Sequence, residues 1–264
     1  MKSNVRTSWQ VTRSVWYALF MREALARTTA DRFAWFWMII EPAAMIVIMV
    51  LIRAAVMGNS HHVGGTEFVP WFIVGLFGFY LYRENTMRLI GAIDANKALF
   101  AYRQVKPIDP VFIRSYVETV LKTFVFLIFI VLSPLLSIDL TPDNILLAFV
   151  AWFALWALGF GIGLILSVLS TLYPEIGKIA RIVSFPLLLV SCVLFPIHYV
   201  PHSFREIVLM NPIVHGVELL RSSFFSDYEL IEGISSLYLL IWVLASISLG
   251  MALHIRFKNE LKAK

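Results

Sequence analysis

The chain has 264 residues, of which 59% are hydrophobic and 15% charged, with a formal net charge of +5 and a mean hydropathy of +0.80. This composition is too apolar for a soluble domain and indicates a polytopic membrane protein. We expect one compact membrane domain over residues 1–264 and no nucleic-acid partner.

The first segment, residues 1–32, is basic and rich in aromatic residues. On a helix its apolar arc consists of Trp9, Val15, Trp16, Leu19 and Phe20. Such an arc, with arginines at its edges, is typical of a helix that lies in the membrane interface. Three polar residues, Thr12, Glu23 and Arg27, interrupt the arc, so an ordinary amphipathic helix is the alternative. The residues that we assign to the lipid interface are Trp9, Arg13, Trp16, Arg22, Arg27 and Arg32.

Six apolar runs follow and predict an all-α fold with six transmembrane helices. The second run is the weakest, because Arg83, Glu84 and Arg88 occupy its last turns. We divide the domain into an interfacial helix (1–32), a six-span core (33–255) and a cytoplasmic tail (256–264). The predicted spans are 33–57, 68–89, 112–137, 144–170, 178–196 and 235–255.

Lysine and arginine residues orient these spans. Segments on one side of the predicted membrane hold 18 of the 22 lysines and arginines in the chain. Since cytoplasmic loops are enriched in these residues, we expect both termini to be cytoplasmic. The cytoplasmic segments are 1–32, 83–114, 174–181 and 256–264.

Two connections are too long to be simple turns. After the second span, Asp94 or Asn96 is the expected N-cap of a short surface helix that runs to about Val105. On the outer side, residues 197–234 contain apolar pieces too short to span, broken by prolines such as Pro212. These pieces predict a hairpin of re-entrant or interfacial half-helices. The polar groups of irregular backbone at that depth must form hydrogen bonds with protein or with water in a cavity.

Motifs for enzymatic chemistry are scarce. The sequence lacks a G-x-x-x-x-G-K-[ST] motif, so ATP hydrolysis by a P-loop is excluded. The glycines of residues 159–163 lie inside an apolar span, where close helix packing is a better explanation than phosphate binding. The histidine pairs 61–62 and 198/202 have no carboxylate or cysteine at ligand spacing, so we expect no bound metal or other cofactor.

Charged residues inside the spans are the strongest functional indication. Arg114, Glu118 and Lys122 form one stripe on the third span, because they recur every fourth residue. Charges at this depth face protein or water. The stripe is explained equally by internal neutralisation of Glu118 by Lys122 and by a conduit wall or subunit seam. The candidate conduit residues are Glu41, Arg53, Arg114, Glu118 and Lys122.

Two motifs carry a resemblance to a known family. The stretch LFMREALARTTADRFAWFWMIIEP resembles the L-x-R-E…W-x-x-x-E-P opening of capsule-type polysaccharide export permeases. The stretch FPIHYVPHSFREIVLMNPIVHGVELLR resembles their outer hairpin, F-P-x-x-x-x-P…N-P…E-x-x-R. With the order of helices, this resemblance covers essentially the whole chain and identifies it as similar to the permeases of ABC-2-type exporters. The hairpin residues concerned are Arg205, Asn211, Pro212, Glu218 and Arg221.

The resemblance implies the permease subunit of an ATP-driven exporter of capsular polysaccharide, often acidic and lipid-terminated, in the bacterial inner membrane. It implies a homodimer, a separate nucleotide-binding subunit that carries ATP and Mg²⁺, a periplasmic adaptor or co-polymerase, and an outer-membrane exporter. A permease for O-antigen, teichoic acid, or a drug or small lipid is an alternative within the class. A membrane-embedded glycan-modifying enzyme and a non-catalytic scaffold are alternatives from other classes.

The resemblance also places an ATPase-coupling helix between the second and third spans. We expect Phe100 and Tyr102 to be exposed there as interface anchors, although Phe100 could instead pack on the spans. We further expect Glu41 to pair with Lys122 or with an arginine of the first helix, since Glu41 and Lys122 lie at similar depth in the membrane. In the outer hairpin, Arg205 and Arg221 are expected to satisfy half-helix ends or to approach the substrate. The coupling residues are Asn96, Lys97, Leu99, Phe100, Tyr102, Arg103 and Lys106.

Overall fold

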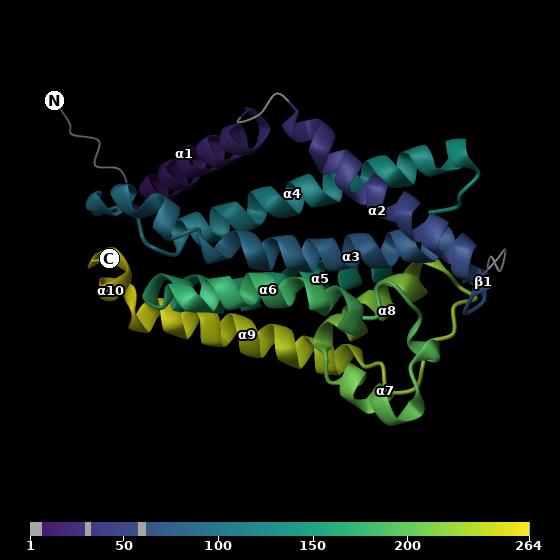
Figure 1. Ribbon diagram of the computed structural model, residues 1–264. Coiled ribbons are helices and arrows are strands. Elements are labelled where there is room, and N and C mark those ends of the chain that lie inside the picture. Colours follow the sequence, from purple (N-terminus) through teal and green to yellow (C-terminus); the bar gives the residue numbers. More distant parts are fainter. Residues whose placement is uncertain (1–6, 30–32, 58–61, 264) are drawn as a thin grey trace.

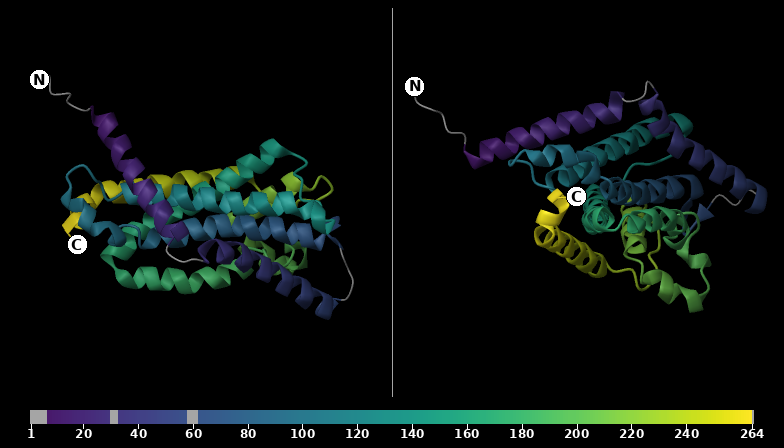
Figure 2. Two further views of the ribbon diagram at one scale, coloured as in Figure 1. Left: turned by 90° about the horizontal axis from the view of Figure 1, so that it is seen from above. Right: turned by 60° about the vertical axis from the view of Figure 1, so that its left-hand side comes forward.

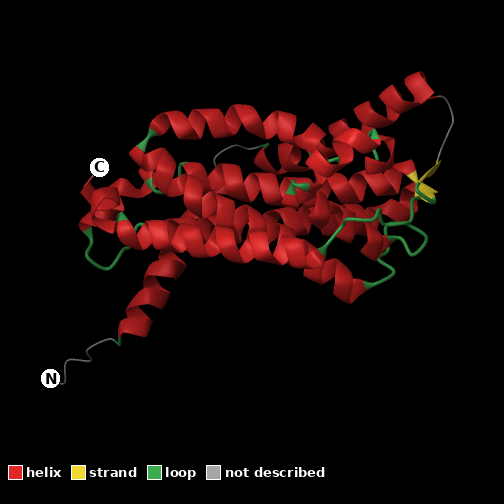
Figure 3. Ribbon diagram, turned by 90° about the horizontal axis from the view of Figure 1, so that it is seen from below, coloured by secondary structure: helices red, strands yellow, loops and turns green. Residues whose placement is uncertain are grey.

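The computed structural model describes residues 7–29, 33–57 and 62–263, and most of them lie in helices (Figure 3). Within these residues the strands are limited to β1 (His62–Val63) and β2 (Thr66–Glu67), which pair antiparallel at one end of the molecule. This architecture confirms the predicted all-α class. The long helices are α1 (Ser8–Thr29), α2 (Ala34–Met57), α3 (Phe68–Ile90), α4 (Asp109–Leu132), α5 (Ile145–Leu172), α6 (Pro174–Val190) and α9 (Ser236–Arg256). The short helices are η1 (Asp94–Ala101), η2 (Ser133–Leu136), η3 (Ile197–Tyr199), α7 (His202–Leu209), α8 (Pro212–Phe224) and α10 (Lys258–Ala263).

Each of the six predicted spans contains a long helix: α2, α3, α4, α5, α6 and α9. Four of these, α2, α4 continued by η2, α5 and α9, are long and apolar enough to cross a membrane. Helix α3 carries its three charges in the last two turns, and α6 has 17 residues. The number of crossings therefore stays a prediction for α3 and α6.

Helix α5 is the centre of the bundle and approaches its neighbours through glycines (Figure 1). A Cβ on Gly159 would collide with the backbone of Tyr82 in α3, and a Cβ on Gly161 would collide with Ser246 in α9. Small residues let helix backbones approach closely, which maximises van der Waals contact where lipid supplies no hydrophobic driving force. The predicted packing role of residues 159–163 is confirmed.

Helix α3 is buried along most of its length. Its apolar two-thirds packs against α4, α5 and α8, and side chains such as Trp71, Phe72 and Leu76 are fully enclosed. The charged end of α3 lies at the end of the bundle where η1 and α10 also lie (Figure 1). The strands and α7 lie at the opposite end.

Helices α1 and α2 lie on the outside of the bundle. Figure 2 shows α1 crossing the long axis of the bundle at an angle and α2 leaning away toward its C-terminal end. The apolar side chains of α2 are largely exposed, including Phe36, Val47 and Leu51. Helix α1 packs on α4, whereas α2 packs on α3.

Candidate functional site

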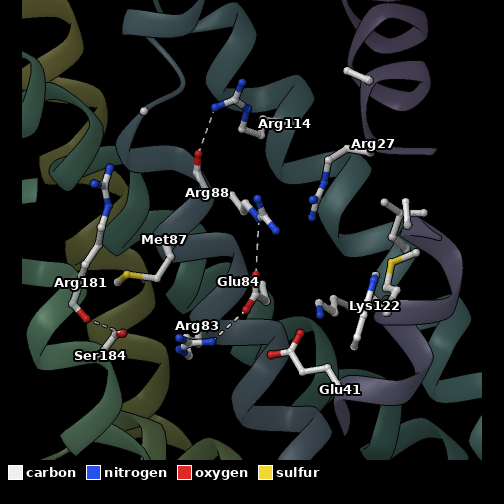
Figure 4. Close-up of a pocket in the computed structure, with 16 residues that line it drawn as sticks. Arg27, Glu41, Arg83, Glu84, Met87, Arg88, Arg114, Lys122, Arg181 and Ser184 are labelled. Atoms are coloured by element: carbon white, nitrogen blue, oxygen red, sulfur yellow. Dashed lines mark hydrogen bonds and ion pairs between the residues drawn. The ribbon is translucent and has the colours of Figure 1, made fainter. Parts of the chain in front are cut away.

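A polar cavity of about 860 Å³ lies between α1, α2, α3, α4 and α6. Six of its lining residues are arginines or lysines and two are glutamates, so the walls are cationic (Figure 4). A polar space of this size within an otherwise apolar helical protein is what a conduit for a hydrophilic substrate needs. Its lining residues are Ala26, Arg27, Ala34, Trp37, Met38, Glu41, Arg83, Glu84, Met87, Arg88, Gly91, Arg114, Leu121, Lys122, Arg181 and Ser184.

Two ion pairs attach α1 to α4 along one wall of the cavity. Arg114 Nε donates to Glu23 Oε1 at 2.8 Å, and Arg27 Nη2 donates to both oxygens of Glu118 at 2.6 and 2.8 Å. The two residues of each helix are four apart and opposite in sign, so the pairs match in register. Glu118 is 1% exposed, and a buried carboxylate without such a partner is strongly destabilising.

A third carboxylate organises the cations of α3. Glu84 contacts Arg83 at 3.0 Å and Arg88 at 3.5 Å (Figure 4). Arg88 also lies 4.0 Å from Glu118. Arg114 donates in addition to the backbone oxygen of Arg88 at 3.3 Å. Four cavity arginines, called the paired arginines below, therefore each have a carboxylate within 4.0 Å. They are Arg27, Arg83, Arg88 and Arg114.

The predicted stripe on α4 is thus divided: Arg114 and Glu118 form ion pairs with α1, whereas Lys122 forms none with the described residues. Neutralisation of Glu118 by Lys122 is wrong, because Arg27 of α1 takes that place. The predicted pairing of Glu41 is not formed either: both Glu41 and Lys122 line the cavity, but no ion pair within 4.0 Å joins Glu41 to Lys122 or to a described arginine of α1. Lys122 instead places its Nζ 5.6 Å from the centre of the Tyr80 ring.

Arg53 does not belong to this cavity. It lies near the C-terminal end of α2, with its guanidinium carbon 4.2 Å from the centre of the Phe68 ring. A cation over an aromatic ring is a stabilising contact that needs no substrate. The structure therefore separates Arg53 from the other candidate conduit residues.

The expected orientation of α1 toward lipid is wrong for most of the arc. Val15, Trp16, Leu19 and Phe20 pack against α4, and Trp16 Nε1 donates to Asp109 Oδ1 at 3.0 Å. Two of the three polar residues that interrupt the arc, Glu23 and Arg27, form ion pairs with α4, so these two interruptions were the sign of a protein-facing side. The outward side carries the apolar residues Tyr17, Met21 and Leu25, together with Trp9 of the arc. Arg13 is exposed, and Arg32 lies outside the described residues.

The predicted coupling helix is present in a different form. It is the 3-10 helix η1, which ends at Ala101 rather than near Val105, and its N-cap is Ile93 rather than Asp94 or Asn96. Asn96 is buried, bonds back to the Ala92 oxygen and accepts a hydrogen bond from Arg22 of α1. A 3-10 helix has three residues per turn, so it sorts side chains differently from an α-helix.

The prediction that Phe100 is exposed is also wrong. Phe100 is buried in a cluster with Leu89, Ile93 and Val111, whereas Tyr102 is 66% exposed. Leu99 is partly buried at the edge of this cluster. The outward face of the η1 region is cationic and aromatic. It includes Lys97, Tyr102, Arg103 and Lys106, and the acidic residue exposed there, Asp94, pairs with Lys97.

The outer hairpin contains two half-helices of different burial. Helix α7 has no buried residue, while α8 packs against α3, α5 and α9. Asn211 caps α8 by accepting from the Ile213 nitrogen at 3.0 Å, with Pro212 in the first helical position. On α7, Arg205 is half-buried and its Nη2 lies 3.5 Å from the Val200 oxygen.

Arg221 of α8 is fully buried and holds several elements together. Its guanidinium donates to Glu218 at 2.7 Å and to the carbonyls of Cys192 and Val193 at 3.0 and 3.1 Å. It also lies 3.5 Å from the centre of the Trp71 ring of α3. Neither expected role is formed: Arg221 bonds to carbonyls of the loop after α6 and not to a half-helix end, and it is fully buried.

The site includes residues that sequence reasoning had not assigned to it: Arg83, Glu84, Arg88, Arg181 and Glu23. The three charges at the end of the second predicted span were interpreted only as weakening that span. Because Arg83, Glu84 and Arg88 fall within little more than one helical turn, they also indicated a charged helix face. This spacing was the feature of the sequence that could have identified the site. Among the residues that the structure describes, no group of three or more His, Cys, Asp or Glu side chains is arranged to hold a metal ion.

Comparison with known proteins adds independent information. The sequence model of ABC-2 type transporters matches residues 14–225. The polysialic acid transport protein KpsM of Escherichia coli is 33% identical over 94% of this chain and 95% of its own length. The capsule polysaccharide export inner-membrane proteins CtrC of Neisseria meningitidis and BexB of Haemophilus influenzae are 27% and 26% identical, each over 98% of this chain and 96% of their own length.

Proposed function

The chain belongs to the ABC-2 type transporter family, and on this premise we propose that it is the inner-membrane permease subunit of a capsule polysaccharide exporter. The match extends over nearly the whole chain to relatives that are named for this export. Within the molecule, the observation that carries the proposal is the cationic cavity. A hydrophilic polymer needs such a path, and the core formed around α3 and α5 is packed with apolar side chains.

The cavity is the place where the polysaccharide enters the permease. It lies toward the end of the bundle that carries the charged end of α3, η1 and α10, which the distribution of lysine and arginine assigns to the cytoplasm. Both termini are then cytoplasmic, and residues 1–264 act as one transmembrane domain.

Energy for export comes from a separate subunit that binds ATP and Mg²⁺, since this chain has no P-loop. The outward face of the η1 region offers Lys97, Tyr102, Arg103 and Lys106 as its docking contact. An exposed aromatic residue among arginine and lysine is the composition of an interface hot spot. The functional unit is a homodimer of this chain with two such subunits, and it passes the polymer to a periplasmic adaptor and an outer-membrane exporter.

Deletion of the chain from its own host tests this function. We expect surface polysaccharide to disappear and polymer of unchanged composition to accumulate inside the cell, and re-expression of the chain to restore the surface layer. A surface layer that persists after deletion would refute the permease role. Polymer that reaches the surface with an altered sugar composition would indicate a glycan-modifying enzyme instead.

A further inference from the structure

Lys122 differs from the other cations of the cavity. Each of the four paired arginines has a carboxylate within 4.0 Å, and Arg181 is exposed to solvent on α6. Lys122 is only 7% exposed, and no hydrogen bond or ion pair joins it to any described residue. Its aromatic neighbour Tyr80 is a weak substitute, because burying an ammonium group costs several kcal/mol that a cation–π contact only partly offsets.

The position of Lys122 leaves its charge available to a ligand. Its side chain lines the cavity (Figure 4), so an anion there would be shielded from bulk water on several sides. Attraction between opposite charges is stronger in such surroundings than at an exposed surface. Glu41 lines the same cavity but is itself exposed and forms no ion pair with Lys122. A buried cation without a counterion therefore faces a space large enough for several sugar units.

An aromatic surface lies on the same cavity. Trp37 of α2 is 59% exposed and belongs to the lining. The flat apolar side of a sugar ring packs on an aromatic face, while the polar edge of the ring stays free for hydrogen bonds. A site that combines an aromatic platform with one well-placed charge has the usual composition of a small-molecule pocket.

We propose that Lys122 binds the anionic group of an acidic sugar in the exported chain and that Trp37 packs against the ring of that sugar. The anionic group is a carboxylate or a phosphate attached to the sugar. The paired arginines keep their own carboxylates and hold the cavity walls in place. This inference rests on the proposed function for the identity of the cargo, but binding is measured without ATP or transport.

The test uses the full chain in nanodiscs of phosphatidylcholine, so that anionic lipid does not compete. Three probes separate the sources of binding: a sialic acid hexamer, uncharged maltohexaose, and glycerol phosphate as the headgroup chemistry of a lipid. We expect Lys122→Gln to weaken binding of the hexamer about tenfold or more, because one hydrogen bond to a charged group contributes about this much to affinity. Binding of maltohexaose should be unchanged. Trp37→Ala should weaken binding of both sugars.

Two control variants guard against a merely structural effect. Lys122→Arg keeps the charge and should retain the preference for the hexamer over maltohexaose. Lys258→Gln removes an exposed lysine of α10 that does not line the cavity, and should bind all probes like wild type.

Three results would overturn the inference. They are hexamer binding by Lys122→Gln at wild-type strength, equal loss of both sugars in that variant, and binding of glycerol phosphate as tight as that of the hexamer. Each would leave the deletion test of the export function untouched. Conversely, failure of the deletion test would leave the binding result standing.

Discussion

Replacement of Arg221 by methionine is expected to be the most damaging single change in the outer half of the molecule. Arg221 and Glu218 are both 0% exposed and 2.7 Å apart. Methionine keeps much of the side-chain volume but leaves the Glu218 carboxylate buried, with only Tyr228 donating to it at 2.6 Å. Breaking a buried ion pair by removing one partner costs about 3–5 kcal/mol. The lost bonds to Cys192 and Val193 also release the loop after α6 from α8.

Unfolding of the purified chain in mixed micelles, titrated with denaturing detergent, measures this loss. The double variant Arg221→Met with Glu218→Gln should be about 1–3 kcal/mol more stable than Arg221→Met alone, because the buried charge is gone from both partners. Asp227→Asn, at an exposed position of the same hairpin, is the control and should stay within about 0.5 kcal/mol of wild type. Equal stability of Arg221→Met and the control would refute the reasoning, as would a double variant that is less stable than the single one.

Three further sets of substitutions test other parts of the structure. Gly161→Val should force α5 away from α9 and prevent the helices of the chain from packing together. Size-exclusion chromatography measures this, and a normal elution profile would contradict close packing at this glycine. Glu23→Arg and Arg114→Glu should each lower export by loosening α1, and the double exchange should recover part of it because the 2.8 Å pair can re-form with reversed signs; no recovery would argue against the pair. Phe100→Ala should destabilise the fold by about 3 kcal/mol as a core truncation, whereas Tyr102→Ala should leave unfolding unchanged and weaken binding of the ATPase subunit; the reverse pattern would show that η1 is assigned wrongly.

The helices could be predicted from the sequence because bilayer thickness fixes how long an apolar run must be. The glycines of residues 159–163 were also interpreted correctly, since a span offers them few roles besides close packing. These features depend on local composition. They need no knowledge of which helix lies beside which.

The side-chain partners could not be predicted in the same way. The arc on α1 was assigned to lipid because periodicity shows that a face is apolar but not what covers it. Glu118 was assigned to Lys122 by its spacing, whereas Arg27 lies closer in space and 91 residues away in sequence. Phe100 was placed in water because its flanks are basic, yet it is buried among Leu89, Ile93 and Val111. Each error concerns a contact between segments distant in sequence.

Photo-crosslinking in exporting cells tests the central claim, that the polysaccharide passes through the cationic cavity. A photoreactive phenylalanine analogue in place of Trp37 lines the cavity, and the same analogue in place of Phe153 of α5 lies on an exposed face away from it. We expect illumination to attach polysaccharide to the chain at position 37 and not at position 153, and only while the cells have ATP. Continued export with no adduct at position 37, or equal adducts at the two positions, would contradict a path through this cavity.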